Sequence, residues 1–555
     1  MVGQVSHILV ALAAGWFIIA AYRWIRSRSA VVAAIVAATI LGRLALGLAL
    51  FWVSYLNLPI ARSLQLSGGF WQVAPDATGY YQMAARAVDA GRLFPLDHSV
   101  PAPFFIDTLA VWMMAVGVSP AAGMFLNLLL YVTLAVMVVW SFAPVNDIRR
   151  DLPCIVGVAA YSLSPVILFH SSQPLKDELS AFLLGLACLG ITMLRPLFDQ
   201  YRTARDWWAV AGGTVAVTVA TLGTSGIRWY FGFVLWGALV VALGTGVVLA
   251  LLDRRGPRLA LLKGTAAAVL VLIAAFVAFR AGAGPFYRVV IGANLDRLAM
   301  PHQTGGSFVG RIAAIPHDLL NMAQMARTGF VMSGGGTNLV VPLGHDATAG
   351  LNESNRQIET QHATAAYREA EAAVRAASRR GSATSHEAIA APASPVQPSQ
   401  ESATPATLTV PDEYRAVPIT TQEHLQVVAT GIAIVFVPVS LVKAVAQVQI
   451  TGGRGLLSIA DLDTVFLDVM SLAVLILLWK RRHMIGDRRV LVLFGLVVAA
   501  TTAVLLGYVV TNFGTLWRMR SLVAVPLWLL VSALSPRRAI RRQPPTAPGQ
   551  VPAAT

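Results

Sequence analysis

Long, uninterrupted apolar segments constrain this chain more than any other feature of its sequence. Eleven of them approach the roughly 20 residues that an α-helix needs to cross the hydrocarbon core of a bilayer. They are 5–22, 30–56, 119–142, 153–170, 178–194, 207–224, 229–250, 259–281, 463–479, 489–510 and 520–535. The strands of an outer-membrane barrel alternate in polarity over about 10 residues instead. The sequence therefore predicts an all-α polytopic membrane protein with about 11 transmembrane helices.

The composition supports the same class. Hydrophobic residues make up 56% of the 555 residues and charged residues only 12%, whereas a soluble domain carries about 25% charged residues. This excludes a soluble enzyme, a disordered scaffold and a small secreted module held by disulfides. Both cysteines, Cys154 and Cys188, lie in apolar runs, where we expect small core residues. The glycine pair Gly212–Gly213 inside a span predicts close helix packing.

Basic residues indicate the orientation. The net charge is +15, and many arginines and lysines form clusters between apolar segments, which the positive-inside rule places in the cytoplasm. This distribution explains the positive charge without nucleic-acid binding. The clusters share one side if segments 104–117 and 425–449 do not span, so we predict both to be interfacial or re-entrant helices on the outer side. The N-terminus then lies outside and the C-terminus inside.

The predicted organisation has four parts. They are an N-terminal membrane module at 1–281 that includes a first outer loop at 57–118, a large outer loop at 282–462, C-terminal membrane helices at 463–535, and a cytoplasmic tail at 536–555. The large loop contains a low-complexity insertion at about 345–424, rich in Ala, Ser, Thr and Pro near its end, and then the re-entrant segment at about 425–449.

Asp76 is the first candidate site residue. It lies on the first outer loop and is followed by Tyr80, Tyr81 and a predicted amphipathic helix. A carboxylate near the bilayer surface can act as a general base on a hydroxyl group, with the tyrosines positioning the substrate. The alternative is a solvated aspartate that caps the helix.

Lys176, Asp177 and Glu178 form the second candidate group, on a short outer loop just before a span. Lys176 could hold a phosphate, and the two carboxylates could hold an acceptor or a divalent metal. Acidic residues also favour a helix N-terminus, so helix capping is the alternative for Asp177 and Glu178. Capping does not explain the lysine, which the helix dipole disfavours at this position.

Three arginines lie on the side that the positive-inside rule disfavours. Arg228 is on a short outer hairpin, and Arg518 and Arg520 precede the last span. Each could bind a substrate phosphate; the alternatives are an interfacial belt for Arg228 and a lipid headgroup for the other two. Arg43 lies near the middle of the second span, where an unpaired arginine costs roughly 2.5–3.5 kcal/mol, so we predict a buried ion pair.

Four short motifs occur in order along about 450 residues. They are Asp76-Ala-Thr-Gly-Tyr80 on the first outer loop, YSLSPVILFHSS before Lys176-Asp177, GIAIVFVPVSLVKAV in the large loop, and NFGTLWRMR before the last span. Their order and shared side resemble the membrane glycosyltransferases of the GT-C superfamily, which take sugars from polyprenyl-phosphate carriers. The resemblance covers the protein-mannosyltransferase and aminoarabinose-transferase types and their bacterial polysaccharide-assembly relatives. Asp76 stands alone before Ala77, whereas many relatives carry two adjacent acidic residues there.

The resemblance implies an inverting transfer at the outer face of the bacterial plasma membrane. Asp76 would activate a hydroxyl of a glycan or glycolipid acceptor, and Arg518, Arg520, Lys176 and Arg228 would hold the phosphate of the polyprenyl-linked donor. The sequence identifies no certain cofactor, and Asp177 and Glu178 could bind a divalent metal. The alternatives are a polysaccharide polymerase or ligase that uses lipid-diphosphate-linked sugars, a transporter or flippase of lipid-linked sugars, and a scaffold without activity.

Overall fold

The protein is described from a computed structural model. It describes residues 2–71, 74, 76–91, 102–142, 144–198, 204–252, 258–295, 454–485, 488–509, 518–532 and 534, with isolated residues between 425 and 441. The predicted insertion at 345–424 and the tail at 536–555 lie outside the described residues, as do most of the large loop and of the predicted re-entrant segment at 425–449.

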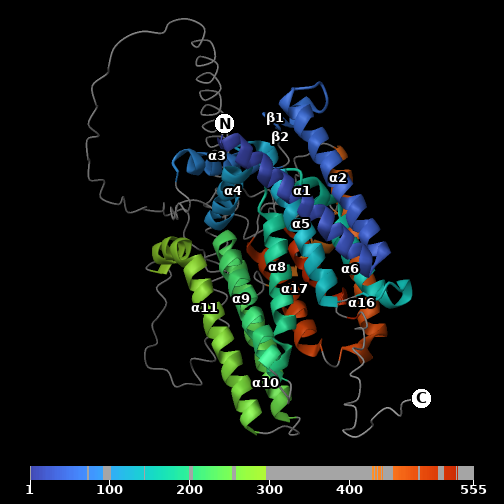
Figure 1. The fold of residues 1–555 in the computed structure, drawn as a ribbon, viewed down its shortest axis with the longest axis vertical. Coiled ribbons are helices and arrows are strands. Elements are labelled where there is room, and N and C mark those ends of the chain that lie inside the picture. The colour runs from blue at the N-terminus through green and yellow to red at the C-terminus, as the bar shows by residue number, and fades with distance from the viewer. Residues whose placement is uncertain are drawn as a thin grey trace, which may run out of the picture.

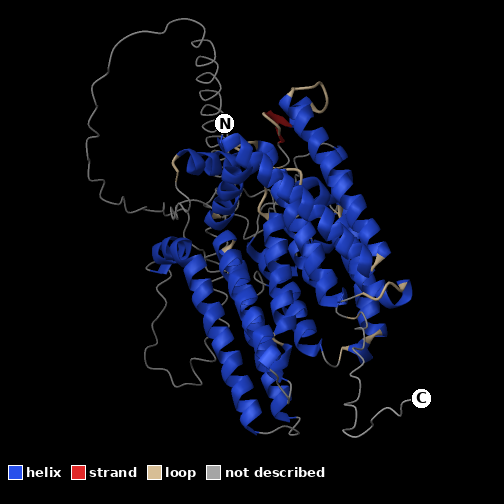
Figure 2. Cartoon of the chain, viewed as in Figure 1, coloured by secondary structure: helices blue, strands red, loops and turns tan. Residues whose placement is uncertain are grey.

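Helices form nearly all of the described chain (Figure 2). The N-terminal half contains α1 (Val2–Arg28), α2 (Ala30–Tyr55), α3 (Asp76–Asp89), α4 (Pro103–Val116), α5 (Pro120–Phe142), α6 (Ile148–Leu163), α7 (Pro165–His170), α8 (Asp177–Met193), α9 (Ala204–Ile227), α10 (Trp229–Leu252) and α11 (Arg258–Leu295). The C-terminal part contains α16 (Arg454–Lys480), α17 (Arg489–Val509) and α19 (Ser521–Ser532). The short elements are the 3-10 helices η1 (Arg62–Leu64), η2 (Arg195–Phe198) and η4 (Arg482–Met484), and the antiparallel hairpin of β1 (Gln65–Ser67) and β2 (Phe70–Trp71).

Nine helices in the described part are long and apolar enough to cross a membrane. They are α1, α2, α5, the segment of α8 with η2, α9, α10, α11, α16 and α17. In Figure 1, α9, α10 and α11 run alongside one another on one side of the bundle, and α1 and α2 run together on the other. These helices confirm a multi-pass, all-α membrane protein.

Two of the eleven predicted spans differ from the structure. The segment 153–170 is divided into α6 and α7 at Ser164, whose backbone leaves the helical region with ψ 120°. Pro165 follows it, and a residue before proline is driven away from helical angles. The Ser164 side chain then accepts a hydrogen bond from the backbone N–H of Ile167 and begins α7. The last predicted span contains α19, whose 12 described residues are short for a crossing.

The helix α4 covers the predicted interfacial segment 104–117. Its 14 residues extend about 21 Å, less than the hydrocarbon core, so this helix is too short to cross alone. It packs against α3, and together they bury a second core that includes Tyr80 and Phe105. Leu175 just before α8, Leu179 in the first turn of α8 and Ile227 at the end of α9 belong to the same core. The first residue of α3 is thereby held near the starts of α8 and α10.

The packing of α8 against α9 depends on glycine. A Cβ added at Gly213 would lie 2.8 Å from the carbonyl oxygen of Gly190, and one at Gly212 would lie 2.7 Å from the Met193 side chain. The close packing predicted from the glycine pair is thus confirmed. Both cysteines are buried and free, as predicted for core residues.

Candidate active site

Five charged side chains gather where several helices begin. Asp76 is the first residue of α3, Lys176 and Asp177 begin α8, Arg228 lies between α9 and α10, and Arg518 precedes α19. We call these residues the charged cluster. Its first and last members are 442 positions apart in the sequence. The fold therefore brings together residues from four of the segments that the sequence singled out.

Ion pairs connect the cluster through Arg518 and Asp177. Arg518 Nη2 lies 3.0 Å from Asp76 Oδ2, and Arg518 Nε lies 3.1 Å from Asp177 Oδ2. Arg228 Nη2 donates to Asp177 Oδ1 at 2.8 Å. Arg518 thus bridges two carboxylates, and Asp177 lies between two guanidinium groups.

Burial differs sharply between the members. The side chains of Arg228 and Arg518 are only 4% and 8% exposed, and Asp177 is 14% exposed, whereas Asp76 is 45% exposed. The cations therefore lie beneath a carboxylate that solvent reaches. A molecule arriving from solvent meets Asp76 first.

Lys176 is the third cation, and its ammonium lies 5.2 Å from the centre of the Tyr80 ring. Burial lowers the pKa of Lys176 to about 7, the nearby Arg228 also lowers this pKa, and Asp76 raises it. Burial likewise raises the pKa of Tyr80, which stays a neutral phenol. Tyr81 instead packs against Phe70 of β2, so the structure brings only the first tyrosine to the cluster.

The cations in the cluster have hydrogen-bonding capacity left over. Arg228 Nη1 is buried and has no hydrogen-bond partner in the described part of the chain. The Arg518 Nε–Asp177 Oδ2 contact is close, but neither atom makes an aligned hydrogen bond. Arg228 and Arg518, together with Lys176 in its protonated form, face two carboxylates here, so an anion would complete the cluster.

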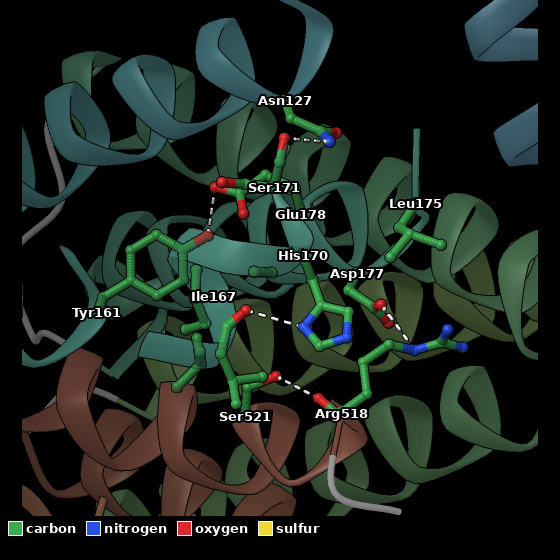
Figure 3. Close-up of a pocket in the computed structure, with 13 residues that line it drawn as sticks. Asn127, Tyr161, Ile167, His170, Ser171, Leu175, Asp177, Glu178, Arg518 and Ser521 are labelled. Atoms are coloured by element: carbon green, nitrogen blue, oxygen red, sulfur yellow. Dashed lines mark hydrogen bonds and ion pairs between the residues drawn. The ribbon is translucent and has the colours of Figure 1, made fainter. Parts of the chain in front are cut away.

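A small pocket lies directly beside the Asp177–Arg518 pair (Figure 3). Asn127 of α5, Tyr161 of α6 and Glu178 of α8 line its other side. His170 lies beside the ion pair, and its Nδ1 is 2.9 Å from the carbonyl oxygen of Val166. A carbonyl oxygen can only accept, so Nδ1 carries the proton of the neutral imidazole.

Glu178 belongs to a different polar group. Its Oε1 accepts from Arg43 Nη1 at 2.7 Å and from the Tyr161 hydroxyl at 2.6 Å. The guanidinium of Arg43 also lies 4.2 Å from the centre of the Tyr131 ring. The buried ion pair predicted for Arg43 is confirmed, and Glu178 is its partner.

Replacing Glu178 with Gln should lower the stability of the protein by about 3 kcal/mol or more, because Arg43 would remain buried without a countercharge. The decrease in Tm of the purified protein in detergent measures this effect. Asp147→Asn is the matched control, since Asp147 pairs with Arg150 at an exposed site, where ion pairs contribute little. Equal Tm values for wild type and Glu178→Gln would contradict the assignment.

Arg520 does not join the charged cluster. Its Nη2 lies 2.7 Å from Asp463 Oδ2 and donates to the carbonyl oxygen of Ala460, and Nη1 donates to the Thr464 hydroxyl. Asp463 also accepts from the Ser164 hydroxyl at 2.8 Å. Arg520 lies directly before α19 and Arg518 two residues earlier, and their side chains reach different partners. The expected phosphate role of Arg520 is therefore replaced by a structural one, which fixes α19 to α16.

Asp177 and Glu178 do not fit a shared metal site. The first is engaged by Arg228 and Arg518 and the second by Arg43, so their carboxylates serve separate guanidinium groups. In the part of the chain that the structure describes, no group of three or more His, Cys, Asp or Glu side chains could hold a metal ion.

Three residues of this region had no predicted role. Asn127 and Asp463 are polar residues inside or at the edge of predicted spans, a signal that indicates function or a buried partner. His170 ends α7 and has no metal-ligand spacing in the sequence. It reaches the pocket as the last residue of α7, the short helix that begins after the break at Ser164–Pro165.

Comparisons with protein-family models, curated proteins and solved structures find no match to this chain. Membership of the GT-C superfamily, which its motifs resemble, therefore stays a prediction.

Proposed function

We propose that this protein is a multi-pass membrane glycosyltransferase that moves a sugar from a polyprenyl-phosphate carrier to a glycan or glycolipid acceptor. The observation that supports the proposal most is the charged cluster: two buried arginines and a lysine beneath an exposed carboxylate, at one end of a membrane bundle. The basic clusters in the sequence favour the outer face of a bacterial plasma membrane as the location of this end.

The cations suit the phosphate of the donor. Arg228 Nη1 has an N–H that no described residue accepts, and Lys176 lies beside the arginines with an aromatic ring as its neighbour. Such donors neutralise the charge that develops on a phosphate as the sugar leaves. Arg518 would shift from its carboxylate contacts toward the same phosphate.

Asp76 suits the acceptor. Its carboxylate is the exposed member of the cluster, so an acceptor hydroxyl can reach it from solvent. The acceptor oxygen would attack the anomeric carbon, its proton would pass to Asp76, and the bond from the anomeric carbon to the phosphate oxygen would break. The products would be the glycosylated acceptor and polyprenyl phosphate, with the configuration of the sugar inverted.

Donor affinity should fall as the pH rises above about 7, by up to tenfold per pH unit. Lys176, whose pKa burial lowers to about 7, must be protonated to bind an anion, and above that pH binding has to take up a proton. The Kd of a polyprenyl-phosphate-linked hexose, a phosphodiester that stays a monoanion, should be measured from pH 6 to 9. In Lys176→Arg the side chain stays positively charged over this pH range, so the Kd of the donor should not change with pH. The same dependence of Kd on pH as in wild type would contradict the role of Lys176.

The choice of donor tests the function. Purified protein in liposomes should release the carrier from polyprenyl-phosphate-linked sugars in the presence of an extracted glycolipid acceptor. A polymerase or ligase would instead require polyprenyl-diphosphate-linked sugars. Release from the diphosphate donors alone would replace the proposed function with this alternative, and release from neither would refute transfer.

A further inference from the structure

The pocket beside the Asp177–Arg518 pair combines apolar walls with a few polar atoms. Ile167, Leu175 and Ala181 supply apolar surface, and Asn127 supplies an amide. Asp177 and Arg518 line this pocket, and the exposed Asp76 does not. In the proposed reaction, the acceptor would use the exposed side, so this pocket is left for the donor.

Asn127 presents an acceptor that none of the described residues uses. Its Nδ2 donates to the carbonyl oxygens of Ser171 at 3.1 Å and Gln173 at 2.8 Å. Carbonyl oxygens only accept, so these two bonds fix which end of the amide is nitrogen. Oδ1 is buried and has no hydrogen-bond partner among the described residues, although the residue is only 1% exposed. A buried acceptor without a partner requires a ligand or a water molecule that donates to it.

The charges around the pocket favour a neutral group. Asp177 is already paired with Arg228 and Arg518, and Glu178 is already paired with Arg43. An ammonium group would find no free countercharge among the described residues that line the pocket, and an anion would face Glu178. A hydroxyl group on a short methylene arm suits both the apolar and the polar surface of the pocket. The methylene contacts the aliphatic side chains, and the hydroxyl donates to Asn127.

We propose that this pocket receives the hydroxymethyl arm of the transferred sugar and that Asn127 Oδ1 accepts a hydrogen bond from its hydroxyl. The proposal rests on the proposed function, because it takes the phosphate of the donor to lie on the cations of the charged cluster. Asn127 is then a specificity residue: it favours hexoses over sugars that lack the hydroxyl. A 6-deoxy sugar would leave Oδ1 buried and unpaired.

The first test compares two donors on the same protein. Polyprenyl-phosphate-linked glucose, mannose and galactose should each be paired with the 6-deoxy analogue, and kcat/KM measured for each. Wild type should favour the hydroxylated member of the productive pair by about tenfold or more. In Asn127→Leu this ratio should fall to near one. Because the ratio is taken within one preparation, a lower yield of folded variant does not affect it.

Thr133→Val is the matched control on the same helix. The Thr133 hydroxyl donates to the carbonyl oxygen of Leu129, and the residue does not line the pocket, so the donor ratio should stay at the wild-type value. Equal rates for both donors in wild type, or an unchanged ratio in Asn127→Leu, would overturn the proposal while leaving the transferase function intact.

The second test does not depend on transfer. Saturation-transfer NMR with methyl hexosides in detergent should show contact at the C6 protons in wild type and loss of that contact in Asn127→Leu. Contact in a protein that transfers no sugar would support the pocket and refute the proposed function. No C6 contact in wild type, with any of the three methyl hexosides, would overturn the pocket assignment.

Discussion

Asp76→Asn should lower the turnover number by about 10²–10⁴, with little change in the KM for the donor. The amide keeps the size of the side chain and can still accept from Arg518 Nη2, which lies 3.0 Å from the carboxylate. It cannot take a proton from an acceptor hydroxyl. Because the donor phosphate would be held by other residues, its binding should survive the substitution. Initial rates of carrier release at several donor concentrations separate the two parameters.

Asp89→Asn is the control for this variant. Asp89 ends the same helix and is exposed, so neutralising it should leave the rate unchanged. Asp76→Glu should retain part of the activity, because it keeps a base but moves it by one methylene. A turnover number for Asp76→Asn equal to that of wild type would remove Asp76 as the base.

Arg518→Ala should lower kcat/KM by about 10²–10³. Its guanidinium contacts both Asp76 and Asp177, at 3.0 and 3.1 Å. Its removal takes away a cation, and the negative charges of the two carboxylates then repel each other. Arg518→Lys should recover only part of the lost kcat/KM. The guanidinium of arginine is a rigid fork that reaches both carboxylates, whereas the ammonium of lysine is a single compact charge. Steady-state kinetics in liposomes checks both variants, and Tm values of the purified proteins show whether each one is folded.

The control for Arg518 is Arg86→Ala. Arg86 is an exposed arginine in the last turn of α3, so its loss changes the net charge equally without touching the charged cluster. An equal decrease in kcat/KM for both variants would indicate a general charge effect. Unchanged kinetics in folded Arg518→Ala would exclude Arg518 from phosphate binding.

Hydropathy predicted most of the fold because the bilayer imposes a length on each helix. It did not show that the segment at 153–170 contains two helices, since averaging over a window hides a single Ser164–Pro165 break. That break could be predicted from the proline itself, which restricts the residue before it. His170, which ends the second of these helices, lines the same pocket as Asp177, and hydropathy cannot indicate this.

The positive-inside rule singled out Arg228, Arg518 and Arg520, but it did not show which of them join the charged cluster. Arg518 and Arg520 look alike in the sequence, yet one reaches Asp76 and the other is bound by Asp463. Asp177 and Glu178 are adjacent and serve different arginines. Each distinction depends on which face of a helix a residue occupies and on which helix lies opposite, and these are set by tertiary packing.

Carrier release in proteoliposomes tests the central proposal most directly. Wild type and Asp76→Asn should be reconstituted with polyprenyl-phosphate-linked sugars and extracted glycolipid acceptors, and the polyprenyl phosphate and glycosylated acceptor measured together. We expect wild type to form both products in equal amounts and Asp76→Asn to form almost none. Equal release by the two proteins would contradict the role of Asp76, and no release by wild type with any donor would contradict the transferase itself.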